Sequence, residues 1–170
     1  MLGALVGGRI GIPRSGLAAS RSGLTIAIRY GDGRRQFGPE GGAEVPILNY
    51  RAHQRRLIPK LANTYALHFA LRYLTNRYVN RKEEEMQEIE ALAAGLKAIA
   101  TWHTSDTLQE CREACGGKGY LWENRIGTLK NDTDITPPLR VIILFCCNSL
   151  PRADFLTLSR SSAAWVHWGF

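Results

Sequence analysis

The chain has 170 residues, 45% of them apolar and 22% charged, a composition typical of one globular domain with a hydrophobic core rather than of a disordered polypeptide. Four cysteines are too few for a disulfide scaffold, and the longest strongly apolar run, residues 141–147, is far shorter than the roughly 20 residues that span a bilayer, so no membrane span is expected. The formal net charge of +7 leaves nucleic acid, a membrane surface and an anionic small ligand open as partners.

The first predicted helix covers residues 2–30 and is rich in glycine and alanine. Glycines at positions 31 and 33 end it, and a loop with further glycines and prolines follows over residues 38–46. The first 35 residues hold six arginines and one acidic residue, namely Arg9, Arg14, Arg21, Arg29, Arg34, Arg35 and Asp32. A phosphate-rich ligand at one edge of the fold explains this cluster as well as a nucleic acid does.

The second predicted helix covers residues 47–80, and its apolar side chains recur at helical spacing. They form two stripes, Leu57, Leu61, Tyr65 and Phe69 in one and Leu67, Leu71, Leu74 and Tyr78 in the other. The two stripes together predict a wide buried face.

The third predicted helix covers residues 82–115 and begins with three glutamates, which suit the positive end of a helix dipole. Its predicted core face consists of Ile89, Leu92, Ala93, Leu96, Ile99 and Ala100. Two glycines at positions 116 and 117 end it. Three long helices joined by short loops predict an all-α fold, an antiparallel helical bundle.

Residues 136–170 differ in character from the rest. They have no helical periodicity, and β-prone residues run through the segment. A chain that is locally consistent for 135 residues and then ceases to be so requires an explanation. We therefore divide the chain into a helical domain at residues 1–135 and an irregular, poorly ordered tail at residues 136–170.

Two composite motifs carry the chemistry. The first combines residues 34–38 (RRQFG) with residues 47–54 (ILNYRAHQ), and the second combines residues 111–120 (CREACGGKGY) with residues 123–125 (ENR). Together and in this order they resemble the acyl-CoA oxidase family, within the acyl-CoA dehydrogenase and oxidase superfamily. The resemblance covers residues 1–135 and implies the first helical domain after the sheet domain of such an oxidase.

The resemblance implies an FAD site. An arginine and main-chain N–H groups at a glycine turn suit the pyrophosphate of FAD. In the family, the adenine-diphosphate part of a flavin held mainly by the neighbouring subunit is contacted at the positions of Arg34, Gln36, Phe37 and Gln54. Gly116 and Gly117 allow the backbone to approach the dinucleotide closely. Related dehydrogenases carry glutamine at the position of Glu113, so we expect no direct flavin contact there.

The resemblance also implies an activity and a setting. In the intact family, a glutamate takes a proton from a fatty acyl-CoA while a hydride passes to FAD. Oxygen then reoxidises the flavin, and the products are a trans-2-enoyl-CoA for fatty acid β-oxidation and hydrogen peroxide. Such oxidases form homodimers. Their compartment is the peroxisome in a eukaryotic host and the cytoplasm in a bacterial host.

The family's catalytic base is missing from its expected place. In the family, residues 131–135 correspond to a segment followed by an aromatic residue and then TTFEGDNTVL, whose glutamate is the base. This chain continues instead from Thr136 as TPPLRVIIL, with Arg140 in the place of that glutamate. Codons permitted for residues 136–154, regrouped one base earlier, encode TTFEGDNTVLLQLVAKSR. We therefore predict that a base lost after the Ile135 codon created a frameshifted tail, which leaves no catalytic residue and no activity in the chain alone.

Two other functions remain open from the sequence. One is a non-catalytic helical module that pairs with an intact oxidase subunit. The other is a basic nucleic-acid-binding bundle, although the arginine-rich first 35 residues lack interleaved aromatic stacking platforms and a reading-helix motif. A metal site is not expected, because His103, Cys111 and Cys115 lack a fourth ligand and only the two cysteines share a helix face closely.

Overall fold

The computed structural model of the chain describes residues 2–136, so the predicted tail from residue 137 onward, including Arg140, lies outside the described residues. Within residues 2–136 there are four α-helices and no strand: α1 Leu2–Gly33, α2 Arg51–Val79, α3 Met86–Ala114 and α4 Ile126–Asp134. Short 3₁₀ turns occupy Ile47–Asn49, Glu83–Glu85, Gly116–Tyr120 and Trp122–Asn124. The prediction of an all-α fold is confirmed.

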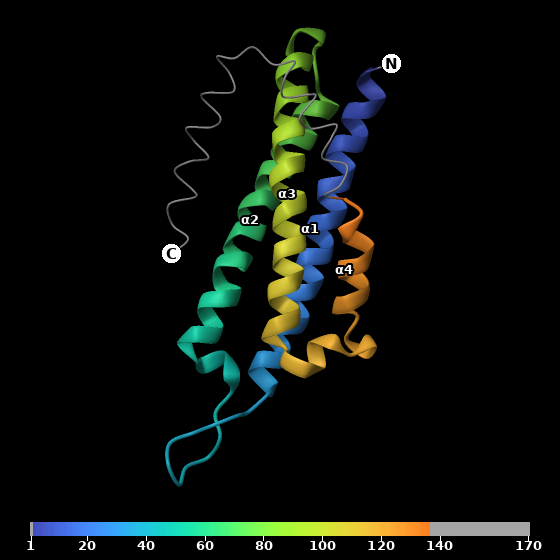
Figure 1. Ribbon diagram of the computed structural model, residues 1–170. Helices are drawn as coiled ribbons and strands as arrows, with labels where there is room; N and C mark the ends of the chain where they lie inside the picture. The colour runs from blue at the N-terminus through green and yellow to red at the C-terminus, as the bar shows by residue number, and fades with distance from the viewer. Residues whose placement is uncertain (1, 137–170) are drawn as a thin grey trace.

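The three long helices lie side by side and alternate in direction (Figure 1). We call the end at which α1 ends, α2 begins and α3 ends the lower end of the bundle, and the opposite end the upper end. The short helix α4 packs against α3 and α1. This arrangement is the antiparallel helical bundle that the sequence predicts. Among the described residues, no helix combines the length and the apolar character that crossing a bilayer requires.

The helix boundaries differ slightly from the predicted ones, for local reasons. α1 continues to Gly33 rather than ending at residue 30. α2 begins only at Arg51, because the preceding Ile47–Asn49 turn is separated from it by Tyr50 in an extended conformation. The three glutamates form their own turn, Glu83–Glu85, directly before α3, where the helix dipole favours negative charge.

Glycines allow α1 to pack closely against α3. A Cβ at Gly16 would lie 2.9 Å from Oγ1 of Thr104, and a Cβ at Gly23 would lie 2.7 Å from Cδ2 of Leu108. These two glycines are seven residues apart and therefore share one face of the helix. The α1–α3 contact is accordingly the most extensive in the bundle.

The hydrophobic core consists of three clusters along the bundle axis. The upper cluster contains Val6, Ile10, Leu74, Ile89 and Ala93. The middle cluster contains Leu17, Leu71 and Ala100. The lower cluster contains Leu24, Ala27, Leu57, Cys111, Ala114, Cys115 and Ile126. Within the described residues, only the lower cluster joins side chains from all four helices, so the core at the lower end connects more helices than the core above it.

One of the two stripes predicted to be buried on α2 is wrong for most of its length. Leu57 is buried, but Tyr65 and Phe69 are each 61% exposed. Residues spaced by four advance about 40° beyond a full turn at each step, so such a stripe winds away from the core after one or two steps. On α3 the prediction of a buried Ile99 is also wrong, since this side chain is 53% exposed, whereas Ile89 is buried as predicted.

Candidate functional site

The residues predicted to contact a cofactor lie at one end of the bundle. The connection from α1 to α2, with residues 34–46, extends beyond the lower end, and the turn Gly116–Tyr120 follows α3 at the same end (Figure 1). The connection and the turn are about 80 residues apart in sequence. Both lie at the lower end because adjacent helices run in opposite directions.

Residues 34–47 form an arm stabilised by backbone hydrogen bonds. The N–H of Gln36 donates to the carbonyl oxygen of Val45 over 3.0 Å, and the N–H of Val45 donates to that of Phe37 over 2.9 Å. The N–H of Ile47 donates to the carbonyl oxygen of Arg34 over 2.8 Å. Phe37 has a φ of 59° and is 69% exposed. The arm thus holds Arg34, Gln36 and Phe37 away from the core, where a ligand can reach them.

Tyr50 connects the arm to the first turn of α2. Its hydroxyl donates a hydrogen bond to the carbonyl oxygen of Gln36 over 3.2 Å. Its own carbonyl oxygen accepts from the N–H of Gln54 over 3.0 Å. Tyr50 therefore links two of the residues predicted to contact the cofactor. This role of Tyr50 was not predicted from the sequence, although the residue lies within the motif at residues 47–54.

The glycines after α3 differ in why the fold requires glycine at each position. Gly116 has a φ of 58°, a left-handed conformation that favours glycine. A Cβ at Gly119 would lie 2.0 Å from the carbonyl oxygen of Arg112, so only glycine fits there. A Cβ at Gly117 would meet nothing within 4 Å. The fold explains Gly116 and Gly119, whereas Gly117 is left with an open surface on which a ligand or another polypeptide can lie.

Aromatic and apolar side chains surround this glycine turn. The guanidinium of Arg112 lies 4.1 Å from the ring centroid of Tyr120, a cation–π distance. Leu121 is 50% exposed and Trp122 is 76% exposed. Exposed apolar side chains gathered at one end of a helical bundle are typical of a surface that contacts something else.

His53 lies behind the arm and packs against the end of α1. Its Nε2 is buried and has no hydrogen-bond partner among the described residues, and a Cβ at Gly31 would come within 3.0 Å of that atom. Burial, and secondarily the charge of Arg56, lowers the pKa of His53. The ring is therefore favoured in its neutral form, and its contact with Gly31 gives it a packing role against α1.

A network of charged and amide side chains crosses three helices above the glycine turn. Arg56 of α2 donates to Oε2 of Glu110 over 2.8 Å and also pairs with Glu113. Gln109 donates to Glu113 over 2.7 Å, and Lys130 of α4 donates to Gln109. The hydrogen bond from Gln109, followed by that from Arg56, lowers the pKa of Glu113. The carboxylate of Glu113 is thus engaged by side chains of its own chain.

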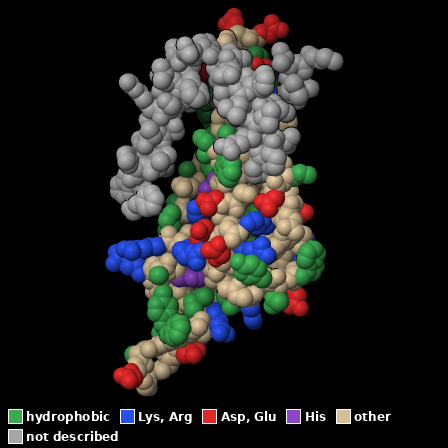
Figure 2. Space-filling view, viewed as in Figure 1, with side chains coloured by type: hydrophobic (Ala, Val, Ile, Leu, Met, Phe, Trp, Pro, Cys, Tyr) green, Lys and Arg blue, Asp and Glu red, His purple; other side chains and the backbone are tan. Residues whose placement is uncertain are grey.

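On the face shown in Figure 2, basic and acidic side chains are interspersed with apolar ones over the middle and lower part of the bundle. The network of charged and amide side chains could not be predicted from the sequence, because its partners, such as Arg56 and Glu110, are 54 residues apart.

The histidine and cysteines considered for a metal are engaged in other ways. Nε2 of His103 lies 2.8 Å from Oγ1 of Thr64 and 3.2 Å from Oγ1 of Thr107. Burial, with a smaller contribution from the charge of Lys60, lowers the pKa of His103 to about 4. Burial raises the pKa of the Cys111 thiol to about 12, which makes it a poor thiolate donor.

Comparisons with a family model and with curated proteins lead to the same family. The family model described as "Acyl-CoA oxidase, C-alpha1 domain" matches residues 2–138. The chain is 48% identical over 138 residues to acyl-coenzyme A oxidase 2, peroxisomal, of Arabidopsis thaliana, covering 79% of this chain and 20% of that protein. It is 41% identical to human peroxisomal acyl-coenzyme A oxidase 3, covering 78% of this chain and 21% of that protein. The chain therefore spans about a fifth of the length of these curated relatives.

Solved structures agree with the sequence comparison. Acyl-CoA oxidase 1 of Arabidopsis thaliana matches with a TM-score of 0.72 and 35% identity, covering 82% of this chain and 22% of that one. Acyl-CoA oxidase-1 of Caenorhabditis elegans, in a complex with FAD and ATP, matches with a TM-score of 0.71 and 31% identity, covering 75% of this chain and 20% of that one.

Proposed function

This chain belongs to the acyl-CoA oxidase family, and we propose that its helical bundle is one wall of the FAD site of an oxidase acting on fatty acyl-CoA. The bound flavin supplies the oxidising chemistry of such a site, yielding a trans-2-enoyl-CoA and hydrogen peroxide. The residues of this chain bind and orient it. The observation that carries the proposal is the exposed arm with Arg34, Gln36 and Phe37 at the same end as the open Gly117 surface.

The side chains at this end fit a dinucleotide. Arg34 supplies a positive charge and hydrogen-bond donors for a pyrophosphate, and Phe37 supplies an exposed ring for stacking. Gln54 supplies an amide near the base of the arm. The absence of any atom within 4 Å of a Cβ at Gly117 leaves room for backbone to approach a ligand.

A polypeptide of these 170 residues has, in this proposal, no turnover of its own. Arg140 stands where the family's glutamate base is expected, and losing a general base costs about 10²–10⁴-fold in rate. The segment also corresponds to only about a fifth of the curated relatives. Nucleotide sequencing through the Ile135 codon tests the frameshift hypothesis; an uninterrupted reading of the present tail, with no base missing, would contradict it.

A chimaera tests the cofactor role directly. Residues 1–135 would replace the corresponding segment of the Arabidopsis thaliana relative, which is 48% identical, so that the remaining domains and the base come from that protein. We expect the chimaera to bind FAD and to release hydrogen peroxide from palmitoyl-CoA. An Arg34→Ala change in it should weaken FAD binding about tenfold or more, as loss of a charge-assisted contact does.

Arg55→Ala is the matched control in the same chimaera, because Arg55 is an exposed arginine near the start of α2 that the proposal does not use. It should leave FAD affinity unchanged. Equal affinity for FAD in the Arg34→Ala and unmodified chimaeras would remove the cofactor role from the arm. The 170-residue chain, purified and assayed in parallel, should be colourless and produce no peroxide.

A second candidate is a non-catalytic module that pairs with an intact oxidase subunit. Exposed apolar side chains on α2, including Ile58, Phe69 and Tyr73, favour it, since a free surface of this kind is typical of an interface. Co-purification of the tagged chain with an intact oxidase of the same host tests this candidate. The proposed setting is a homodimer in the peroxisome for a eukaryotic host, as for the peroxisomal relatives, and the cytoplasm for a bacterial host.

A further inference from the structure

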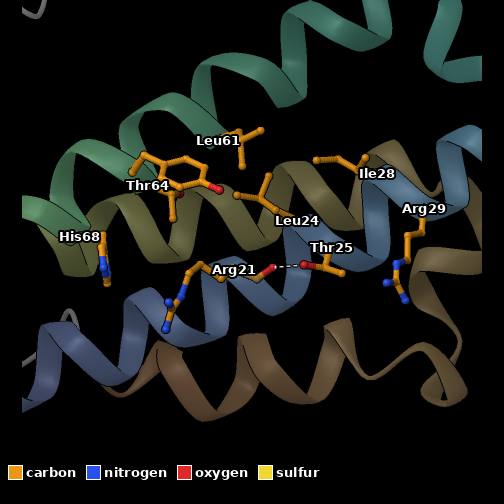
Figure 3. Close-up of a pocket in the computed structure, with 9 residues that line it drawn as sticks. Arg21, Leu24, Thr25, Ile28, Arg29, Leu61, Thr64 and His68 are labelled. Atoms are coloured by element: carbon orange, nitrogen blue, oxygen red, sulfur yellow. Dashed lines mark hydrogen bonds between the residues drawn. The ribbon is translucent and has the colours of Figure 1, made fainter.

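A groove runs along the surface between α1 and α2. Two adjoining cavities of about 390 Å³ and about 680 Å³ lie between these helices, and both are lined by Arg21 of α1 and His68 of α2. The two cavities meet at these shared residues, and we call them together the α1–α2 groove. Figure 3 shows its lower part, with Leu24 and Ile28 of α1 beside Leu61 and Thr64 of α2.

The two halves of the α1–α2 groove differ in chemistry. The lower half is lined by apolar side chains, including Leu24, Ile28, Leu61 and Tyr65, with Arg29 at its edge. The upper half is lined by Arg14, Arg21 and Arg72. Neither half is lined by any aspartate or glutamate.

The arginines of the upper half are available to an external partner. Within residues 2–136, none of Arg14, Arg21 and Arg72 takes part in an ion pair, in contrast to Arg56, Lys60 and Arg77. All three are exposed. A cluster of unpaired positive charges beside an apolar floor costs free energy through mutual repulsion, and an acidic partner removes that cost.

The residues lining the groove have the spacing of helix–helix seams. On α1 they include Arg14, Ala18, Arg21, Thr25 and Ile28, and on α2 they include Leu61, Tyr65, His68, Arg72 and Thr75. Both series alternate steps of four and three residues, which is the repeat by which one helix packs into another. Two such seams side by side form a trough for a third helix.

The length of the trough defines the size of the occupant. From Arg14 to Ile28 the α1 seam spans about 21 Å at the helical rise of about 1.5 Å per residue. A helix of about 15 residues, or about four turns, covers it. A trough of this length, with an apolar and a cationic half, matches an amphipathic helix better than a compact small ligand.

We propose that the α1–α2 groove is the docking site of an amphipathic helix that carries apolar side chains along one half and acidic side chains along the other. The apolar half packs on Leu61 and Tyr65, and the acidic half faces Arg14, Arg21 and Arg72. This proposal does not depend on the flavin role of the lower end. Charge complementarity excludes α1 of a second copy of this chain as the occupant, since α1 carries arginines rather than acidic residues on the groove face.

The first test measures binding of designed peptides to the full 170-residue chain by fluorescence anisotropy. The probe is a labelled helical peptide of about 15 residues, with leucines on one half and glutamates on the other, made in both orders along the peptide. The matched probe carries lysines in place of the glutamates. We expect one order of the acidic peptide to bind at least about tenfold more tightly than either lysine peptide, since like charges across an interface are strongly disfavoured.

Variants then locate the binding. Arg21→Glu, at the junction of the two halves, should weaken binding of the acidic peptide about tenfold, and Tyr65→Glu should weaken it through the apolar half. Both positions are exposed, so the bundle should fold normally. Lys82→Glu, the same change of charge in the connection between α2 and α3, should have little effect. The double change Arg21→Glu with Arg72→Glu should reverse the preference in favour of the lysine peptide.

Three results would overturn the proposal. One is equal or absent binding of the acidic and lysine peptides. Another is an acidic-peptide affinity that Arg21→Glu and Tyr65→Glu leave unchanged. The third is tighter binding of a short double-stranded DNA, or of phosphatidylcholine–phosphatidylserine vesicles, than of the acidic peptide, with the same sensitivity to Arg21→Glu.

Discussion

Gly119 lies so close to Arg112 that a Cβ on the glycine would come within 2.0 Å of the arginine's carbonyl oxygen. Real Cβ atoms do not approach a backbone oxygen this closely, so the turn after α3 is tied to the last turns of that helix through a position that only glycine can fill. The guanidinium of the same Arg112 covers the Tyr120 ring. The geometry of the glycine turn is therefore tied to α3.

Gly119→Ala should destabilise the bundle by about 1–3 kcal/mol, because the turn must move to accommodate the methyl group. Thermal unfolding followed by circular dichroism measures the change. Gly117→Ala is the matched control, since its Cβ meets nothing within 4 Å, and it should change stability by less than about 0.5 kcal/mol. In the chimaera, Gly117→Ala should nevertheless weaken FAD binding; unchanged affinity would leave Gly117 without a cofactor role.

Tyr50→Phe should loosen the arm at residues 34–47. The change removes the hydrogen bond to the carbonyl oxygen of Gln36, whose net contribution is about 1 kcal/mol, so the arm should be cleaved by a protease up to about fivefold faster. Limited proteolysis followed by mass spectrometry measures the rate. Tyr65→Phe, which removes an exposed hydroxyl from α2, should not alter cleavage. An unchanged rate for Tyr50→Phe would mean that backbone hydrogen bonds alone hold the arm.

His103→Gln should flatten the pH dependence of stability in mildly acidic solution. The folded-state pKa of His103 is lowered from 6.5 to about 4, so the unfolded chain binds the proton more readily between these values. The stability that neutral His103 contributes is therefore fully present above pH 6.5. It decreases as the pH falls and levels off below about pH 4, with a total loss of about 3 kcal/mol. Urea unfolding at several pH values measures it. A slope that survives His103→Gln would assign the effect to other groups.

Arg56→Gln should weaken the network across α2 and α3 only modestly. The Arg56 side chain is 39% exposed, so solvent screens its ion pairs with Glu110 and Glu113 and the loss of stability should be small. The lowered pKa of Glu113 means that its contribution is present above its ordinary pKa of 4.5 and is lost as the pH falls below it. Because salt screens ion pairs, the unfolding free energies of the variant and the parent should differ less at high salt than at low salt. A loss that salt does not reduce would indicate a packing role for the Arg56 stem.

The three long helices could be predicted from the sequence because long amphipathic segments leave few alternatives, whereas the short helix α4 was not predicted. Burial on α2 was predicted less well, because the four-residue spacing of Leu57, Leu61, Tyr65 and Phe69 indicates a helix without defining how far one face stays toward the core. The face of α2 that is buried in the core includes Leu71 and Leu74, three residues apart. Only the packing of α1 and α3 determines which apolar positions are covered.

The candidate site was predicted by motif rather than by geometry. The motifs indicated residues at the lower end, but they could not reveal that Tyr50 supports the arm or that Gly119 is required by Arg112. Both relations depend on backbone positions that are fixed only after the chain folds. The pairing of Arg56 with Glu110 likewise depends on the register between α2 and α3.

The division of the core into three clusters has a consequence for fluctuations of the bundle. Side chains of the upper cluster, such as Val6 and Ile89, share no cluster with Cys111 or Ile126 below. Transient opening at the upper end therefore leaves the packing beneath the arm intact. Amide hydrogens should exchange with solvent first near the α2–α3 connection and last around the lower cluster. A flavin bound at the lower end would then rest on the part of the molecule that opens least often.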